Sequence, residues 1–352
     1  MTPFCCKTVR HQTDLATRKH ALMILGTASH VGKSIITAGL GRIFSDDGYR
    51  VAPFKSQNMS LNSVATPDGG EIGRAQAFQA EACRVVPQVE MNPVLLKPST
   101  DTGAQVILLG RIWKQVTAWD YHTRSVEELF PHAYAAYQRL AADHDLVLLE
   151  GAGSPAEINL REHDIVNMRM AHAADAACLL VADIDRGGAF ASLLGTVELL
   201  EPADRARFRG FVINKFRGDQ SLLQPGVAMM ERRLRLPCLG VVPYLSDLGL
   251  DEEDGVALEE RLSPARQWRN PASGAARALR IGVIVLPHMA NFTDFDPLAL
   301  EPAVSLAYVE QPSELAAADL VILPGTKQTM DDLMWLEDRG FAQELRRLHQ
   351  RG

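Results

Sequence analysis

Short apolar runs alternate with longer amphipathic segments from residue 21 to about residue 243. Six of these runs are almost continuously hydrophobic: 21–26, 49–54, 145–151, 177–183, 209–215 and 238–243. Strands buried on both faces of a parallel sheet show this pattern, because helices cover both of their sides. Helical patterns separate the runs, near 33–46, 71–85, 125–142, 187–200 and 221–234. The alternation predicts an α/β domain with a doubly wound, mostly parallel sheet.

The pattern changes after residue 261. Residues 262–278 are rich in Pro, Ala, Arg and Ser and lack an apolar stripe, which is typical of a linker. A second β/α start follows, with the apolar runs RIGVIVLP and DLVILPG. We therefore expect four parts, which are a disordered extension at 1–19, a first domain at 20–261, a linker at 262–278 and a second domain at 279–352.

The composition is that of a soluble globular protein, with 47% hydrophobic and 22% charged residues in 352. No apolar run is long enough to span a bilayer, and the polar N-terminus lacks the apolar core of a secretory signal. A net charge of -7 argues against nucleic acid as the main partner. The five cysteines show no C-x-x-C spacing and the histidines are scattered, so we expect a cytoplasmic protein without a disulfide framework or a zinc site.

The segment GTASHVGKS (26–34) follows the first apolar run and precedes a helical pattern. It nearly fits G-x-x-x-x-G-K-S/T, except that Thr27 stands where the first glycine is expected and Gly26 comes one residue early. A strand, a glycine-containing turn and a helix are the context that a P-loop requires. Lys33 would then reach the β/γ-phosphates, and Ser34 would ligate Mg²⁺. The alternative is an ordinary strand-to-helix turn with an exposed lysine.

The loop form G-T-x-S/T-x-V-G-K-S/T is found in dethiobiotin synthetase and its relatives. Further unusual strings follow in order: PFKSQNMSLNS (53–63), NPVLLKP (92–98), EGAGSPAEINLREHDIVNM (150–168), ADIDRGGAFAS (182–192), INKFRGD (213–219), VVPYLSDLGLDEED (241–254) and NFTDFDPL (291–298). Together they resemble the cobyric acid synthase family, the glutamine-hydrolysing ligases of cobalamin biosynthesis. The resemblance implies a dethiobiotin synthetase-like P-loop domain and, after it, the N-terminal part of a flavodoxin-like, class I glutamine amidotransferase-like domain.

The resemblance also implies a reaction, the ATP- and Mg²⁺-dependent amidation of the b, d, e and g side-chain carboxylates of (adenosyl)cobyrinic acid a,c-diamide. A carboxylate is a poor acyl donor, so ATP would first convert it to an acyl phosphate that ammonia then attacks. The implied partners are the corrinoid and glutamine or ammonia, with neither nucleic acid nor a membrane, and a homodimer is left open. One alternative is cobyrinic acid a,c-diamide synthase. Another is a non-catalytic P-loop ATPase of the partitioning type, which usually carries an extra lysine early in the loop.

Candidate site residues stand where predicted strands end, at the edge at which open α/β sheets bind ligands. Glu150 ends one strand and is a natural Mg²⁺ ligand together with the P-loop serine, although it could be a solvated strand end. By the resemblance, Lys55 lies near the carboxylate that receives the phosphate, and the alternative is a surface lysine. Gln57, Asn58 and Asn62 offer donors and acceptors suited to corrinoid amides.

A second group of candidates follows the next two strands. Asp183 or Asp185 would help to hold Mg²⁺ or orient ammonia, and Arg186 would steady an acyl-phosphate oxygen. For Asp185 a helix N-cap is an equal alternative. Asn214 resembles the asparagine with which the family reads adenine, and its alternative is an Asx-turn. The predicted nucleotide-binding residues are Thr27, Gly32, Lys33, Ser34 and Asn214.

The second domain resembles the start of a glutaminase. LPG (323–325) corresponds to a loop that helps to form the oxyanion site, and in that family a catalytic cysteine follows in a motif such as G-x-C-G-G. The sequence ends at Gly352 before such a cysteine, and Cys238 lies in a strand of the first domain. We therefore expect a C-terminally truncated chain that uses ammonia and not glutamine.

Overall fold

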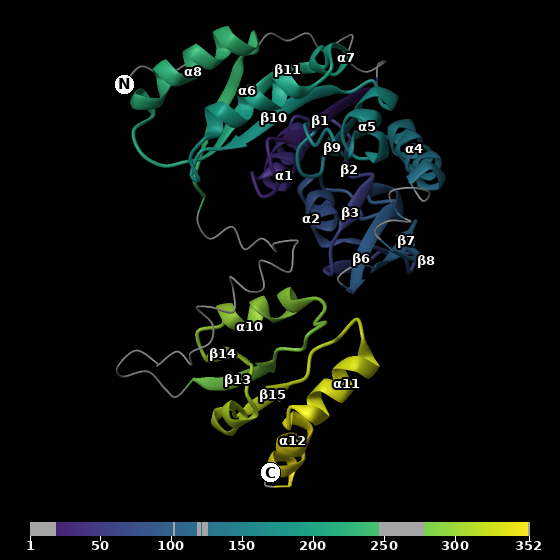
Figure 1. Cartoon of the computed structure of the whole chain (residues 1–352), viewed down its shortest axis with the longest axis vertical. Coiled ribbons are helices and arrows are strands. Elements are labelled where there is room, and N and C mark those ends of the chain that lie inside the picture. Colours follow the sequence, from purple (N-terminus) through teal and green to yellow (C-terminus); the bar gives the residue numbers. More distant parts are fainter. Residues whose placement is uncertain (1–18, 101–102, 118–120, 122–125, 246–277, 351–352) are drawn as a thin grey trace.

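The computed structural model describes residues 19–100, 103–117, 121, 126–245 and 278–350 (Figure 1). The predicted extension at 1–19 and the predicted linker at 262–278 lie, apart from their last residues, outside the described part of the chain.

A six-stranded parallel sheet forms the centre of the first domain. Its strands, in spatial order, are β12 (Cys238–Pro243), β11 (Phe208–Phe216), β10 (Ala177–Asp183), β1 (His20–Gly26), β9 (Leu146–Glu150) and β2 (Val51–Phe54). The main helices that connect them are α1 (Lys33–Asp46), α4 (Val126–Asp143), α5 (Met168–Ala173), α6 (Ala189–Leu199), α7 (Pro202–Arg205) and α8 (Gln220–Leu234). Each predicted apolar run forms a strand, so the predicted parallel α/β fold is confirmed.

Side chains of β1 alternate between the two faces of this sheet, as the pleat requires. Met23 and Leu25 join a large core cluster with residues of α4, α6 and α8. Ile24 joins a smaller cluster on the other face, against which Ile36 and Leu40 of α1 pack. Helices therefore cover both faces, and the carboxyl ends of the strands are left as the edge at which loops can build a site.

A second, smaller sheet is inserted between β2 and α4, and the sequence pattern did not predict it. Its strands, in spatial order, are β3 (Gln57–Met59), β6 (Val94–Thr100), β7 (Gly103–Leu108) and β8 (Arg111–Thr117). The insertion also contains β4 (Ser63–Ala65), β5 (Glu71–Gly73), α2 (Arg74–Ala82) and the short helix η2 (Val89–Met91). Figure 1 shows this sheet and α2 next to the β2 edge of the main sheet. The insertion thus brings further side chains to the carboxyl edge.

The second domain has a three-stranded parallel sheet of its own, with β13 (Leu279–Ile284) between β14 (Val304–Val309) and β15 (Leu320–Ile322). Its helices are η5 (Phe292–Phe295), α10 (Asp296–Leu300), η6 (Pro312–Ala317), α11 (Thr329–Asp338) and α12 (Phe341–His349). A separate core cluster that includes Val283, Leu315 and Phe341 holds these elements together. The domain therefore has an independent core.

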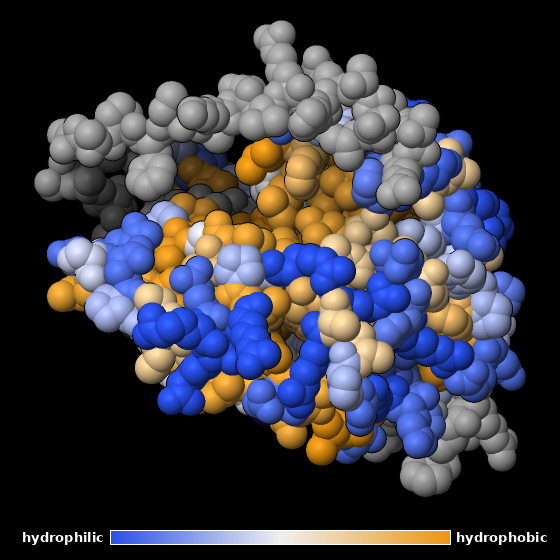
Figure 2. All heavy atoms as spheres, turned by 90° about the horizontal axis from the view of Figure 1, so that it is seen from above, coloured by the Kyte–Doolittle hydropathy of each residue, from blue (hydrophilic) through white to orange (hydrophobic). Residues whose placement is uncertain are grey.

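Among the described residues no helix is long and apolar enough to cross a membrane. The face seen in Figure 2 mixes hydrophilic and hydrophobic residues.

Candidate active site at the carboxyl edge of the main sheet

The P-loop has the geometry that its unusual glycine spacing requires. Gly32 caps the N-terminus of α1 with a φ of 97°, in the left-handed region that favours glycine. A Cβ atom on Gly32 would lie 2.1 Å from Nδ2 of Asn214. A Cβ atom on Gly26 would lie 2.7 Å from Cγ2 of Val31 and 3.0 Å from Nζ of Lys33. Both glycines therefore permit a close approach of other groups to the loop, and the early Gly26 belongs to the site.

Lys33 lies beneath the loop and is almost fully buried. Its Nζ donates hydrogen bonds to the carbonyl oxygens of Ala28, at 3.0 Å, and Gly153, at 3.1 Å. The backbone N–H of Thr27 donates to the carbonyl of Val181 at 2.9 Å, which ties the start of the loop to β10. The alternative of an exposed lysine is wrong. Lys33 instead bridges the P-loop and the loop that follows β9.

Glu150 is the centre of a buried polar network on one side of the P-loop. Its Oε1 accepts hydrogen bonds from Oγ of Ser34 and Nζ of Lys55, each at 3.0 Å. Its Oε2 accepts a hydrogen bond from Nε2 of Gln79. The side chains of Lys55 and Glu150 are only 5% and 1% exposed. A surface lysine and a solvated glutamate, the alternatives considered for these two residues, are therefore wrong.

The network keeps Glu150 ionised. Burial alone would raise the pKa of Glu150, because it disfavours the charged form of a carboxyl group. The charge and hydrogen bond of Lys55, the hydrogen bond of Gln79 and the charge of Lys33 outweigh this effect and hold the pKa below its ordinary value. The site therefore presents one carboxylate anion next to the hydroxyl of Ser34.

These groups suit Mg²⁺ better than a transition metal. Among the described residues, no three side chains of His, Cys, Asp or Glu are grouped so as to hold a metal ion. Mg²⁺ commonly binds through one or two carboxylates, with waters and substrate phosphates as the remaining oxygen ligands. The single carboxylate of Glu150 and the hydroxyl of Ser34, beside a loop shaped for phosphate, fit that manner of binding.

The other side of the P-loop is held by residues of β10 and β11. Nζ of Lys215 donates to Oδ2 of Asp183 at 2.9 Å and to the carbonyl oxygen of His30 at 2.7 Å. Nδ2 of Asn214 donates to the carbonyl oxygen of Val31 at 2.8 Å. Asn214 therefore binds the P-loop in this structure and does not form the Asx-turn considered from the sequence. This side fixes the backbone of the loop.

The remaining two predicted residues lie in the loop before α6, outside the network around Glu150. Asp185 is exposed and pairs with Nε of Arg217 at 2.9 Å, and Arg186 is exposed as well. The residue at the N-cap of α6 is Gly188, with a φ of 72° and no side-chain cap. The alternative that Asp185 caps this helix is therefore wrong.

Two of the three amides predicted to face the corrinoid form hydrogen bonds within the protein. Gln57 accepts a hydrogen bond from the hydroxyl of Tyr121. Nδ2 of Asn58 donates to Oε1 of Gln76 at 3.1 Å, and Asn58 and Asn62 are buried. In this structure the amides of Gln57 and Asn58 bond to other side chains of the protein.

Gln79 and Asn167 were missed by the sequence analysis. Oδ1 of Asn167 accepts from the N–H of Ala152 at 3.0 Å, and Nδ2 donates back to the carbonyl of Ala152 at 2.9 Å. A Cβ atom on Gly151 would lie 2.3 Å from that Oδ1, so the glycine permits this contact. Asn167 falls within the string 150–168, which could have drawn attention to it. For Gln79 the available signal was a glutamine among the apolar positions of an expected helix.

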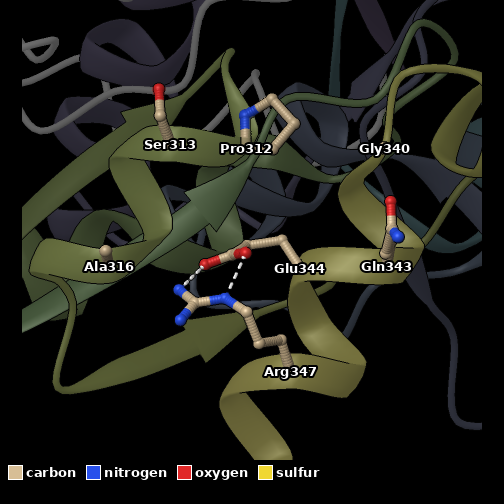
Figure 3. A pocket seen from close by; sticks show the side chains of 7 residues that line it. All are labelled: Pro312, Ser313, Ala316, Gly340, Gln343, Glu344 and Arg347. Atoms are coloured by element: carbon tan, nitrogen blue, oxygen red, sulfur yellow. Dashed lines mark hydrogen bonds and ion pairs between the residues drawn. The ribbon is translucent and has the colours of Figure 1, made fainter.

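A hollow of about 530 Å³ lies elsewhere, in the second domain between η6 and α12 (Figure 3). Its lining residues are Pro312, Ser313, Ala316, Gly340, Gln343, Glu344 and Arg347. The two charged residues, Glu344 and Arg347, form an ion pair with each other. It contains none of the predicted site residues, and we do not assign the reaction to it.

Two family models match the chain in the comparison with known proteins. Residues 22–258 match the family model of the CobQ/CobB/MinD/ParA nucleotide binding domain, and residues 280–352 match that of the CobB/CobQ-like glutamine amidotransferase domain. The chain is 55% identical over 331 residues to the cobyric acid synthase of Yersinia enterocolitica, covering 94% of this chain and 63% of that protein. It is 56% identical over 331 residues to the cobyric acid synthase of Desulforudis audaxviator, covering 94% of this chain and 65% of that protein.

The chain thus spans less than two thirds of the length of these curated relatives. Among solved structures, the signal recognition particle receptor FtsY of Elizabethkingia anophelis matches with a TM-score of 0.38 and 15% sequence identity. That match covers 67% of this chain and 60% of the FtsY chain.

Proposed function

Because the chain belongs to the family of CobQ/CobB/MinD/ParA nucleotide-binding domains, we propose that it is the ATP-dependent synthetase part of a cobyric acid synthase together with a segment of its amidotransferase domain. The proposed reaction amidates the b, d, e and g carboxylates of (adenosyl)cobyrinic acid a,c-diamide, with nitrogen from glutamine or ammonia. The identities of 55% and 56% to named cobyric acid synthases support this choice over the other members of the family.

The observation that carries the proposal is the network of Ser34, Glu150 and Lys55 beside Lys33. In the proposed assignment, Lys33 binds the β- and γ-phosphates of ATP, and the backbone around Thr27 and Gly32 cradles them. Ser34 and Glu150 hold Mg²⁺. When bound there, the ion would supply positive charge that offsets the negative charge of the phosphates.

Lys55 is the proposed positioning group for the carboxylate that reacts. It is held at the carboxyl edge of the sheet by Glu150, 3.0 Å away. There its positive charge counters the negative charge of a substrate carboxylate that approaches the negatively charged γ-phosphate. A carboxylate oxygen attacks the γ-phosphorus and ADP leaves, which gives the acyl phosphate. Ammonia then attacks the acyl carbon, phosphate leaves, and the nitrogen loses a proton to give the amide.

The residues on the β10 and β11 side have supporting roles in the proposal. Asn214 reads the adenine edge, and Asp183 or Asp185 orients ammonia or contributes to the metal site. Arg186 steadies an oxygen of the acyl phosphate. The proposed units are a synthetase domain at 20–261 and an amidotransferase segment at 279–352, joined by the linker at 262–278. The proposed compartment is the cytoplasm. A homodimer is compatible with the proposal.

Mass spectrometry of the corrinoid product tests the proposal. The protein is incubated with the a,c-diamide, ATP, Mg²⁺ and ¹⁵N-ammonium, and we expect up to four labelled amides per corrinoid. Lys33→Ala should form these amides about 10²–10³-fold more slowly. Lys114→Ala should match the parent protein, because Lys114 is a partly exposed lysine of the inserted sheet that pairs with Glu128 of α4. Labelling of cobyrinic acid but not of its diamide would favour the a,c-diamide synthase. ATP hydrolysis that is independent of any corrinoid would favour a partitioning-type ATPase.

A further inference from the structure

Gln79 contacts the carboxylate of Glu150 from the inserted helix α2. It is completely buried, and its Nε2 donates to Oε2 of Glu150 and lies 3.4 Å from the carbonyl oxygen of Ser34. The amide of Gln79 therefore contacts Ser34 and Glu150, which hold Mg²⁺ in the proposed function.

The other end of this amide is unsatisfied in the described structure. Oε1 of Gln79 is buried and has no hydrogen-bond partner among the described residues. Leaving a buried acceptor without a partner is destabilising. A cation beside Glu150 would give this oxygen a partner once the amide turned towards it.

The orientation of the amide depends on what lies beside Glu150. Oxygen and nitrogen of a glutamine amide exchange places when the terminal torsion turns by half a revolution. Without a cation, the N–H end must face the carboxylate, because the oxygen end would meet another negatively charged oxygen. With a cation beside the carboxylate, the oxygen end becomes the favourable one.

On the basis of the proposed function, we propose that Gln79 is a third protein ligand of the divalent cation, with Oε1 as the donor atom alongside Ser34 and Glu150. A neutral amide oxygen is a normal ligand for a hard cation. The amide oxygen of Gln79 would add an oxygen ligand to a site in which Glu150 is the only carboxylate among the proposed ligands. The amide thus holds Glu150 by donation when the cation is absent and turns to accept the cation when it is present.

Binding of Mn²⁺ in the presence of ADP, followed by electron paramagnetic resonance, tests this role without relying on activity. Gln79→Met keeps the length of the side chain and removes its oxygen, and we expect about 10–100-fold weaker Mn²⁺ binding. Gln79→Glu removes the N–H donor but keeps an oxygen, and we expect Mn²⁺ binding at least as tight as in the parent protein. Gln76→Met is the matched control, because Gln76 is equally buried on the same helix but bonds to Asn58. Its Mn²⁺ affinity should stay within about twofold of that of the parent protein, because its amide lies outside the group of residues around Glu150.

Each contrary outcome has a distinct meaning. Unchanged Mn²⁺ binding by Gln79→Met would overturn the assignment of Gln79 and leave the proposed function intact. Equally weak binding by Gln79→Met and Gln79→Glu would show that Gln79 acts only as a donor to Glu150, which also overturns it. A parent protein that binds no Mn²⁺ with ADP would overturn both proposals. If Gln79→Glu is unstable without a cation, Mn²⁺ with ADP should raise its unfolding temperature by more than that of the parent protein, and a smaller rise would count against the ligand role.

Discussion

Glu150 and Asp183 end the two strands that flank the P-loop strand, yet they bind different groups. Glu150 ends β9 and Asp183 ends β10, and both strands pair with β1 in parallel. Glu150 accepts hydrogen bonds from three side chains, which include Ser34 and Lys55. Asp183 instead pairs with Lys215, whose Nζ also binds a backbone carbonyl of the P-loop.

This difference shows that acidic residues at strand ends can have different functions, even on neighbouring strands of one sheet. On the β9 side, the carboxylate of Glu150 binds the side chains that the proposed function places next to the cation and the substrate. On the β10 and β11 side, Lys215 and Asn214 donate to the carbonyl oxygens of His30 and Val31 and so shape the loop. Substitutions on the first side should therefore change stability and cation binding together, whereas substitutions on the second should mainly change the affinity for nucleotide.

The largest effect on stability is expected for Glu150→Gln. The substitution leaves the buried ammonium of Lys55 without its carboxylate, and breaking a buried ion pair from one side typically costs about 3–5 kcal/mol of unfolding free energy. The double variant Lys55→Met/Glu150→Gln removes both charges and should recover most of the loss. Urea unfolding of the two single variants and the double variant measures the coupling. Additive losses would show that the two side chains do not act as a pair.

The pH dependence of stability provides a second test of this pair. The pKa of Glu150 is lowered in the folded protein, so the unfolded chain takes up its proton at a higher pH than the folded one. The stability from ionised Glu150 is present above the ordinary glutamate pKa of about 4.3 and is lost as the pH falls through the lower folded value. Unfolding free energies of the double variant should fall less steeply in this acidic window. Parallel curves would contradict the lowered pKa.

Lys33→Ala should reduce ATP turnover by about 10²–10³-fold, because one preorganised donor to the developing charge is lost. The fold should persist, although the hydrogen bonds from Lys33 to the carbonyls of Ala28 and Gly153 are lost. Phosphate release in the presence of corrinoid and ammonium measures the turnover, with Lys114→Ala as the control. Equal turnover in Lys33→Ala and the parent protein would remove the P-loop from the mechanism.

The main sheet could be predicted because burial on both faces leaves a strong mark on a strand. In β9, for example, four of the five residues are buried, and the four residues before Glu150 are all apolar. The inserted sheet left no such mark. In β8, Arg111–Thr117, only Val116 is fully buried, so charged and apolar residues follow one another without a clear period.

The site was predictable where it is local in the sequence and not where it depends on packing. The P-loop is one continuous segment, and Glu150 and Lys55 both follow apolar runs, so the rule for strand ends found them. Gln79 is 71 positions from Glu150 and reaches it only because the inserted helix packs there. Lys215 was overlooked because its function is to hold a backbone carbonyl, which no side-chain motif encodes.

Asp183→Asn should weaken nucleotide binding by about tenfold while leaving the cation requirement unchanged. The substitution removes the charge opposite Lys215, and a hydrogen bond to a charged group contributes about 1.5–3 kcal/mol, part of which the asparagine oxygen retains. Fluorescence titration with an ADP analogue, with and without Mn²⁺, separates the two quantities. A changed Mn²⁺ affinity would move the metal role from Glu150 towards Asp183 and would end the distinction between the two sides.

The smallest effect on stability is expected for Asp185→Asn, two residues further along. Asp185 pairs with Arg217, and the two side chains are 36% and 58% exposed. Solvent screens such a pair, so its loss should change the unfolding free energy by about 0–1 kcal/mol, and Mn²⁺ affinity should not change. A role in orienting ammonia would be measured separately, as a higher ammonium concentration for half-maximal amidation with unchanged ADP binding. Arg217→Gln is the matched control, because it breaks the same ion pair and keeps the carboxylate. Equal ammonium dependence in Asp185→Asn and Arg217→Gln would show that Asp185 acts only through its surface pair, whereas a shift in Asp185→Asn alone would place its carboxylate in the reaction.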